Sequence, residues 1–447
     1  MNFKRLEVVK GISTLALTAA ISLASCQLAC AKVTTIGNGG TTNVYEENLV
    51  ITSNTNYDKL EVNLTDDISM LCIYGQDKGE NIISLNVKDL VFAGVEGVAS
   101  NCLMVDSKGS LIVDGNAVLK TAYVNLNVEP DHTGAERNKI IFNGPVKLEG
   151  RGIGFYNFNE YVAGTIDSAV TTNILFNGEV SGEGGIETAY QGLTLNNPSN
   201  TFEGDLSASG SMVVLRSPGS VKNVSYIWLE DSLLNILESG EFNVPIEVIA
   251  ASTINVQDDV EIISDITGEG IIIGSADGKT LSLEGENVVT FVDIMWGRIE
   301  VNGEKPTRAF EGTGIVEGAT LGGNGTLVEY VMNYGTINPG TVDETGTLNI
   351  VGDCYQFDSS VISLRIDGEK NDFLNVFGSV VFDTEVQINP TINISITNPV
   401  IGKSYTVLSA KGIYGFENVI LNVTESDDFT VEVVQNARKI VVNILPK

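Results

Sequence analysis

The residues best suited to chemistry are two adjacent aspartates, Asp258 and Asp259, in the run 257–259 (QDD). Two close carboxylates can divide the work of glycoside hydrolysis, one protonating the leaving oxygen while the other activates a water. A serine nucleophile would instead need a histidine base and an orienting aspartate. The single histidine, His132, lies in the run 131–134 (DHTG), far from Asp258 in the sequence. No Gly-x-Ser-x-Gly motif accompanies it.

The aspartate pair resembles the paired aspartates of polygalacturonase-type β-helix enzymes. Those enzymes also carry Asn-Thr-Asp, Gly-His-Gly and Arg-Ile-Lys motifs, and none of these occurs in this chain. We therefore predict that residues 258–259 form a solvated acidic turn, as do 66–67 and 427–428, and that the chain has no catalytic residues. A polysaccharide-degrading β-helix enzyme stays as the less favoured alternative.

Two tryptophans offer a second kind of chemistry, the stacking of sugar rings on an exposed indole. Trp228 and Trp296 both lie in apolar runs, 226–229 (YIWL) and 294–296 (IMW). Because apolar runs of this kind are typical of buried strands, burial of both side chains is the favoured interpretation.

The charge balance limits the partners of the chain. With 26 Lys and Arg against 57 Asp and Glu, the formal net charge is −31. Removal of residues 1–31, which contribute a net +2, changes it to −33. Nucleic acid and anionic lipid both attract basic rather than acidic surfaces, so we expect neither as a partner. No Gly-Gly-x-Gly-x-Asp series and no phosphate-binding loop is present, and we predict no metal site and no cofactor.

The elements that would position these residues are short strands separated by turns. Four runs show the unit: 312–315 (GTGI), 322–327 (GGNGTL), 335–341 (GTINPGT) and 345–350 (TGTLNI). Gly and Asn tolerate positive φ at corners, and the β-branched residues between them favour half-buried strands. Repetition at this density predicts an all-β chain, wound as a right-handed parallel β-helix (a solenoid).

An internal repeat supports this prediction. The run 139–144 (KIIFNG) recurs as 173–178 (NILFNG), 34 residues later, and each copy continues with a valine, Val146 or Val180. Asn-Gly also closes hairpins, but the residues that follow do not mirror the preceding strand. We therefore predict a corner between stacked coils. Cys72 and Cys102 would then lie on neighbouring coils, as a disulfide or as two buried thiols.

The C-terminal segment has a different pattern. Apolar residues alternate at 429, 431 and 433 and again at 440, 442 and 444, on either side of the run 435–438 (QNAR). This period of two predicts a terminal β-hairpin that caps the stack.

Several of these runs together resemble the closing part of bacterial autotransporter passenger domains, the pertactin-like C-terminal region. The match comprises 321–327, 335–341, 345–350, 367–378 (DGEKNDFLNVFG) and 402–410 (GKSYTVLSA). Residues 181–204, and more loosely 267–287, resemble passenger-associated repeats, with a spacing that suggests two coils per repeat. The resemblance implies a passenger-like solenoid at 32–310 and an autochaperone-like region with its capping hairpin at 311–447.

The resemblance also implies a function. We expect a non-enzymatic stalk for adhesion or host-surface contact, whose partners are host-surface or matrix molecules, or neighbouring cell-envelope components. The loops 129–137 and 196–200 are the expected contacts. The family's translocator β-barrel does not follow in this sequence, so a truncated gene, a separately encoded outer-membrane barrel as partner, and lipid anchoring through Cys26 stay open as alternatives, and we favour a passenger-type fragment or a split protein.

Residues 1–31 predict export. Lys4, Arg5 and Lys10 precede an apolar run at 11–24, which is the pattern of a signal peptide. Cleavage between Ala31 and Lys32 is the favoured interpretation. The run 23–26 (LASC) resembles a bacterial lipobox, and its use would make the protein an outer-membrane lipoprotein anchored through Cys26. Either route leads to the outer membrane, the cell surface or the medium, or to the periplasm if no barrel partner exists.

Overall fold

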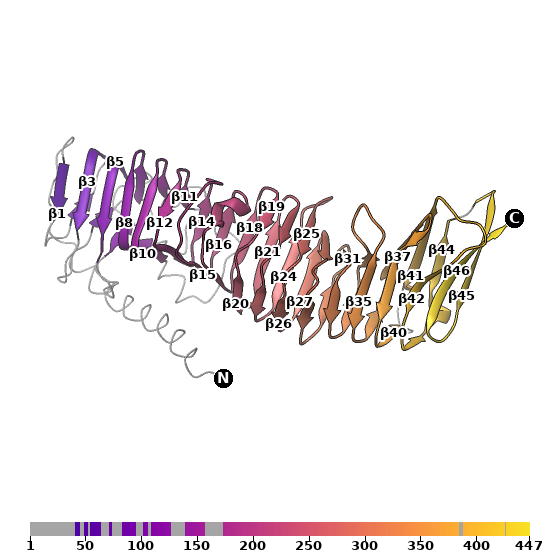
Figure 1. The fold of residues 1–447 in the computed structure, drawn as a ribbon. Coiled ribbons are helices and arrows are strands. Elements are labelled where there is room, and N and C mark those ends of the chain that lie inside the picture. The colour runs from indigo at the N-terminus through magenta and orange to yellow at the C-terminus, as the bar shows by residue number, and fades with distance from the viewer. Residues whose placement is uncertain are drawn as a thin grey trace. The chain divides into compact units, whose positions relative to one another are not determined.

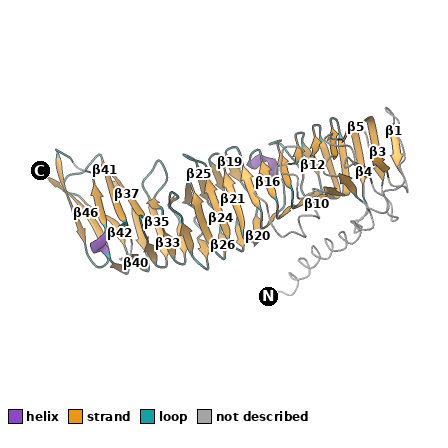
Figure 2. Cartoon of the chain, turned by 180° about the vertical axis from the view of Figure 1, so that it is seen from behind, coloured by secondary structure: helices purple, strands orange, loops and turns teal. Residues whose placement is uncertain are grey.

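The computed structural model describes residues 41–44, 49–51, 54–63, 71–73, 83–94, 102–105, 109–126, 139–156, 173–383, 388–424 and 426–447. The predicted signal peptide, with Cys26, Ala31 and Lys32, lies outside these residues, as do His132, the loop 129–137 and the acidic pair 66–67. Almost every described element is a β-strand (Figures 1 and 2), and the described helices are two short 3-10 segments, η2 (Pro218–Val221) and η3 (Phe416–Asn418). The prediction of an all-β chain is confirmed.

The chain forms two compact units, residues 1–228 and 229–447. The first contains β1 (Thr41–Val44), β2 (Leu49–Ile51), β3 (Thr55–Asn63), β4 (Leu71–Ile73), β5 (Ile83–Ala93), β6 (Leu103–Val105), β7 (Gly109–Val113), β8 (Ala117–Leu126), β9 (Lys139–Phe142), β10 (Val146–Tyr156), β11 (Ile174–Phe176), β12 (Val180–Gly182), β13 (Gly185–Ala189), β14 (Gly192–Leu195), β15 (Leu206–Ser209) and β16 (Met212–Leu215). β17 (Ile227–Glu230) spans the division.

Parallel pairing in the first unit confirms the predicted corner. β11 pairs with β9 in the register that places Phe176 beside Phe142, and β12 pairs with β10 so that Val180 lies beside Val146. The two phenylalanine rings stack with centroids 4.8 Å apart. Beyond each ring, Asn177 donates a 2.9 Å hydrogen bond to Asn143, 34 residues earlier. The repeat is therefore one coil stacked on the next.

The second unit has three strands in most coils, and like strands of successive coils pair to form three faces (Figure 1). Face 1 contains β18 (Leu233–Ile236), β21 (Ser252–Val256), β24 (Ile271–Ser275), β27 (Val292–Trp296), β30 (Thr313–Ile315), β33 (Val331–Asn333), β36 (Cys354–Gln356), β40 (Ser379–Phe382) and β43 (Gly412–Tyr414).

Face 2 contains β19 (Gly240–Phe242), β22 (Val260–Ile262), β25 (Thr280–Leu283), β28 (Arg298–Val301), β31 (Thr320–Gly323), β34 (Thr336–Pro339), β37 (Val361–Asp367), β41 (Thr391–Thr397) and β44 (Ile420–Val423), with β38 (Lys370–Asn371) beside β37. Face 3 contains β20 (Ile246–Ala250), β23 (Ile266–Gly268), β26 (Asn287–Val289), β29 (Thr307–Ala309), β32 (Thr326–Val328), β35 (Thr347–Val351), β39 (Phe373–Val376) and β42 (Ser404–Ser409).

The interior of the second unit consists of ladders of like residues. Ile273, Ile294 and Ile315 occupy one register position in three successive coils, and all are buried. Leu281, Ile299 and Leu321 form the corresponding ladder of face 2. Because each rung packs on the rung before and after it, stability is shared between neighbouring coils. The predicted parallel β-helix is confirmed by these ladders.

The C-terminal hairpin is also confirmed. β45 (Phe429–Gln435) and β46 (Lys439–Pro446) pair antiparallel, and β46 in turn pairs antiparallel with β42 of face 3. The predicted division at residues 310 and 311 separates a passenger part from an autochaperone part, and this functional division stays a prediction. Across it, β29 pairs with β32 in the same parallel manner as the other strands of face 3.

Candidate functional site

The outer side of face 1 carries a row of apolar side chains at one register position. The row consists of the residues that come one position after the aligned partners Ile294, Ile315, Asn333 and Gln356 of β27, β30, β33 and β36. These residues are Met295, Val316, Tyr334 and Phe357. Met295, Val316 and Tyr334 are 38%, 37% and 44% exposed, and Phe357 is half-buried. The rings of Tyr334 and Phe357 stack with centroids 4.5 Å apart and planes 8° from parallel. We call these four residues the apolar row.

A second outward row lies beside the first, two residues earlier in each strand. Its members are cross-coil partners, namely Asp293, Gly314, Met332, Tyr355, Val381 and Tyr414. The ring of Tyr355 lies 6.4 Å from that of Phe357 in the apolar row. Outward positions of a solenoid in water are normally polar, and a contiguous apolar surface typically marks an interaction site. We call the two rows, together with Trp296, the aromatic face.

The prediction that Trp296 is buried is wrong, because this residue is 40% exposed. The register between β24 and β27 shifts after Ile273, so that Trp296 lies opposite Gly274. A Cβ atom at Gly274 would meet three indole atoms at 2.1, 2.2 and 2.6 Å. These similar distances mean that the flat of the ring covers the glycine backbone. Trp228 is half-buried, with its ring 5.0 Å from that of Tyr226.

The orientation of the indole is fixed by a polar contact. Its Nε1 donates a 3.0 Å hydrogen bond to Oδ1 of Asn255, on β21. Nδ2 of Asn255 donates in turn to Oδ1 of Asn235, at 3.0 Å. The N–H of the Trp296 indole is thus hydrogen-bonded and one face of the ring lies on backbone. The surface of the indole that stays free is the opposite ring face, toward solvent.

Two titratable groups of the aromatic face have shifted pKa values. Burial raises the pKa of the Asp293 carboxyl. Burial, followed by the nearby charge of Asp353, raises the pKa of Tyr355, whose hydroxyl donates a 3.4 Å hydrogen bond to Asp353. Both shifts have burial as their main physical cause, since the charged forms lose hydration when the groups are buried.

The aspartate pair considered for hydrolysis lies elsewhere, in the turn between β21 and β22. Nζ of Lys279 lies 2.5 Å from Oδ1 of Asp258 and 3.5 Å from Oδ2 of Asp259. The hydrogen bond from Lys279 lowers the pKa of Asp258. A general acid needs the opposite shift. Asp427 is exposed, beside Lys447.

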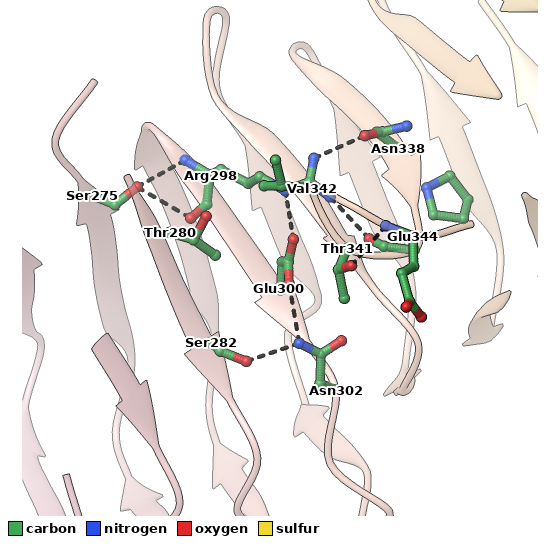
Figure 3. Close-up of polar contacts among 12 residues, drawn as sticks. Ser275, Thr280, Ser282, Arg298, Glu300, Asn302, Asn338, Thr341, Val342 and Glu344 are labelled. Atoms are coloured by element: carbon green, nitrogen blue, oxygen red, sulfur yellow. Dashed lines mark hydrogen bonds and ion pairs between the residues drawn. The ribbon is translucent and has the colours of Figure 1, made fainter. Parts of the chain in front are cut away.

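Face 2 carries a polar cluster that sequence reasoning did not predict (Figure 3). Arg298 donates to Glu300 at 2.7 Å, to Oδ1 of Asn338 at 2.8 Å and to the carbonyl of Gly340 at 2.9 Å. Asn302 donates to Glu300 and to Ser282. The Arg298 and Asn302 donors named here bond to acceptors within the protein. The cluster therefore holds the long turn after β34 against the preceding coils. Arg298, Glu300 and Asn302 alternate along one stretch of the chain, whereas Ser282 and Asn338 come from other coils, 20 and 40 residues away from their partners, which only the coil stacking brings close.

The predicted contact loop 196–200 is partly structural. Asn200 is buried, where it accepts the N–H of Val180 and donates to the carbonyl of Ser220. Asn196 donates to Asn177 and extends the asparagine ladder of the first unit. A contact of this loop with a partner stays a prediction.

Cys72 and Cys102 are both buried on neighbouring coils, as the sequence predicted. Cys72 lies opposite Met104, and the carbonyl of Cys102 accepts the N–H of Leu71 at 3.3 Å. Within the described ranges, no group of three or more His, Cys, Asp or Glu side chains is placed to hold a metal ion. The part of the chain that the structure describes has no helix long and apolar enough to cross a membrane.

No protein-family model matches the chain, and no curated protein matches it in sequence.

Proposed function

We propose that this parallel β-helix is an exported, non-enzymatic recognition protein of the autotransporter-passenger type, which binds a surface molecule through its aromatic face. The observation that carries the proposal is the apolar row. Met295, Val316 and Tyr334 keep more than a third of each side chain in water at one position of three successive coils. Such a surface lowers solubility, so its presence is best explained by a partner that covers it.

The stack behind the aromatic face suits this role. Buried ladders hold each strand from both neighbours, so the backbone that carries the exposed rings is already ordered before a partner binds. The ion pair of Asp258 with Lys279, with its lowered carboxyl pKa, favours recognition over glycoside hydrolysis. The proposed partners are host-surface or matrix molecules, or components of the cell envelope, and a separate outer-membrane barrel would be the export partner.

The experiment is a solid-phase binding assay with the exported chain. Immobilised extracellular matrix, host-cell surfaces and bacterial envelope preparations would be compared as targets. We expect the double variant Tyr334→Ser/Phe357→Ser to lose at least tenfold in affinity for the target that binds the wild type. The matched control is Phe377→Ser, which removes an exposed ring after β39 on face 3. Equal losses in both variants, or wild-type binding in the double variant, would refute the role of the aromatic face.

The export route is tested separately, by the mass of the mature N-terminus. A chain that begins at Lys32 supports ordinary cleavage. A diacylated chain that begins at Cys26 shows instead the lipoprotein route.

A further inference from the structure

We infer that the ligand of the aromatic face is an uncharged polysaccharide chain, and that the exposed side of Trp296 is its main sugar-stacking surface. This inference rests on the proposed function and names the ligand class.

The first step is the position of the Trp296 ring. One side of the indole lies flat on Gly274, and the hydrogen bond to Asn255 holds it there. The other side faces solvent, in a side chain that is 40% exposed. The face of an aromatic ring carries partial negative charge, and the C–H bonds on one side of a pyranose carry partial positive charge. A flat, fixed and exposed indole is therefore suited to a sugar ring lying parallel to it.

The second step is the polar groups beside the ring. Sugar hydroxyls need donors and acceptors at the edge of a stacking surface, because a buried hydroxyl without a partner costs free energy. Nδ2 of Asn235, at the end of the amide ladder that orients the indole, has no acceptor among the described residues. Asp293, on the same strand as Trp296, supplies carboxyl oxygens on the outer side. An amide donor on β18 and a carboxyl oxygen that lies over Gly314 of β30 are therefore available on the same outer side of face 1 as the indole.

The third step is a second flat ring on the same coil. A Cβ atom at Gly270 would meet three ring atoms of Phe291 at 2.0, 2.2 and 2.3 Å, so this ring also lies flat on a glycine. Gly270 and Gly274 are four residues apart along an extended strand, which places the two covered glycines about 13 Å apart. One sugar cannot contact rings at both positions, whereas a chain of several sugars can.

The fourth step is charge. The chain has a net charge of −31, and Asp293 and Asp353 lie on or beside the aromatic face. Arg308, on face 3, is paired with Glu329 at 3.6 Å. Uronic-acid and sulfated polysaccharides would be repelled, and a second copy of this chain carries the same negative charge. An uncharged polysaccharide meets no such repulsion, so the charge favours it over both.

The test is affinity electrophoresis with soluble polysaccharides, confirmed by fluorescence titration. Dextran, a mixed-linkage β-glucan, galactomannan and xyloglucan are the uncharged probes, and polygalacturonate, alginate and heparin are the anionic ones. The Trp228→Phe variant is the reference, because Trp296 is then the only tryptophan and reports binding directly. We expect binding of at least one uncharged probe, with a change in emission, and weaker binding of the anionic probes.

Two variants in that reference examine the stacking surface. Trp296→Leu is expected to weaken binding about tenfold or more. Gly274→Ala keeps the indole but places a Cβ at 2.1 Å from it, so the ring must leave its seat, and a comparable loss is expected. The melting temperature of each variant shows whether it is folded. If Gly274→Ala unfolds, Asn255→Ala, which frees the indole N–H, takes its place.

The outcomes separate the two proposals. Loss of surface binding in Tyr334→Ser/Phe357→Ser, with no uncharged probe bound by the reference protein, would refute the polysaccharide inference and leave the proposed function standing. Tighter binding of an anionic probe, or unchanged binding in a folded Trp296→Leu protein, would also refute the inference. If neither surfaces nor polysaccharides bind, both proposals fail.

Discussion

Arg365 and Asp372 form an ion pair in which Nε lies 2.8 Å from Oδ2, and the carboxylate is completely buried. The same carboxylate accepts the backbone N–H groups of Gly346 and Arg365. The guanidinium also donates to the carbonyls of Pro339, Val342 and Glu344. One pair therefore fixes both β37 and the long turn after β34, which lies between faces 2 and 3.

Removal of the acid should destabilise the second unit. Asp372→Ala leaves the Arg365 guanidinium without its carboxylate and two backbone N–H groups without an acceptor, and we expect a loss of about 3 kcal/mol. Urea denaturation followed by circular dichroism measures it. The control is Glu369→Gln, which breaks an exposed pair with Lys403 and should cost under about 1 kcal/mol. Similar losses in the two variants would contradict this account.

The stacked phenylalanines of the first unit should contribute strongly to stability. Phe176→Ala removes a buried ring that packs on Phe142 of the preceding coil. We expect the free energy of unfolding to fall by about 3–5 kcal/mol, because burial is lost and a cavity remains. Asn177→Ala, which removes the adjacent exposed ladder amide, should cost about 1 kcal/mol. Thermal denaturation of both variants measures the difference. A Phe176→Ala protein as stable as Asn177→Ala would show that the coils do not pack as described.

Cys354 should be unreactive in the folded protein. Burial raises the pKa of its thiol to about 12, so almost no thiolate, the reactive form, exists at pH 8. Iodoacetamide at pH 8, followed by peptide mass spectrometry, should label Cys354 at least a hundredfold faster in urea than in buffer. Rapid labelling of the native chain would mean that the coil from β36 to β39 opens readily.

Asp293 should make stability depend on pH in a defined direction. Its pKa is raised by burial above the ordinary value of 3.8, so its ionised form is disfavoured in the folded state. This penalty is fully present above the folded-state pKa, and it disappears as the pH falls from there to the unfolded-state value. Asp293→Asn should therefore be more stable than the wild type at pH 7, with the difference shrinking toward pH 4. Urea midpoints at both pH values measure it, and a difference that does not change with pH would contradict the assignment.

The sequence alone predicted the parallel β-helix and its capping hairpin. Residues 139–144 and 173–178 repeat the same strand and corner, and the structure places them in register. The alternation at 429–433 and 440–444 likewise specified an antiparallel pair. These features are local patterns of Gly, Asn and β-branched residues, which fix backbone corners and inward positions without reference to distant parts of the chain.

The aromatic face was decided by tertiary structure. The apolar row forms because its four residues lie on strands that share a register. The turns between these strands differ in length, so the four residues recur at no fixed spacing in the sequence. The apolar run before Trp296 predicted burial, but a shift in register at Gly274 turned the indole outward. Strand pairing sets which side chains face water, and in a solenoid that pairing depends on the neighbouring coil.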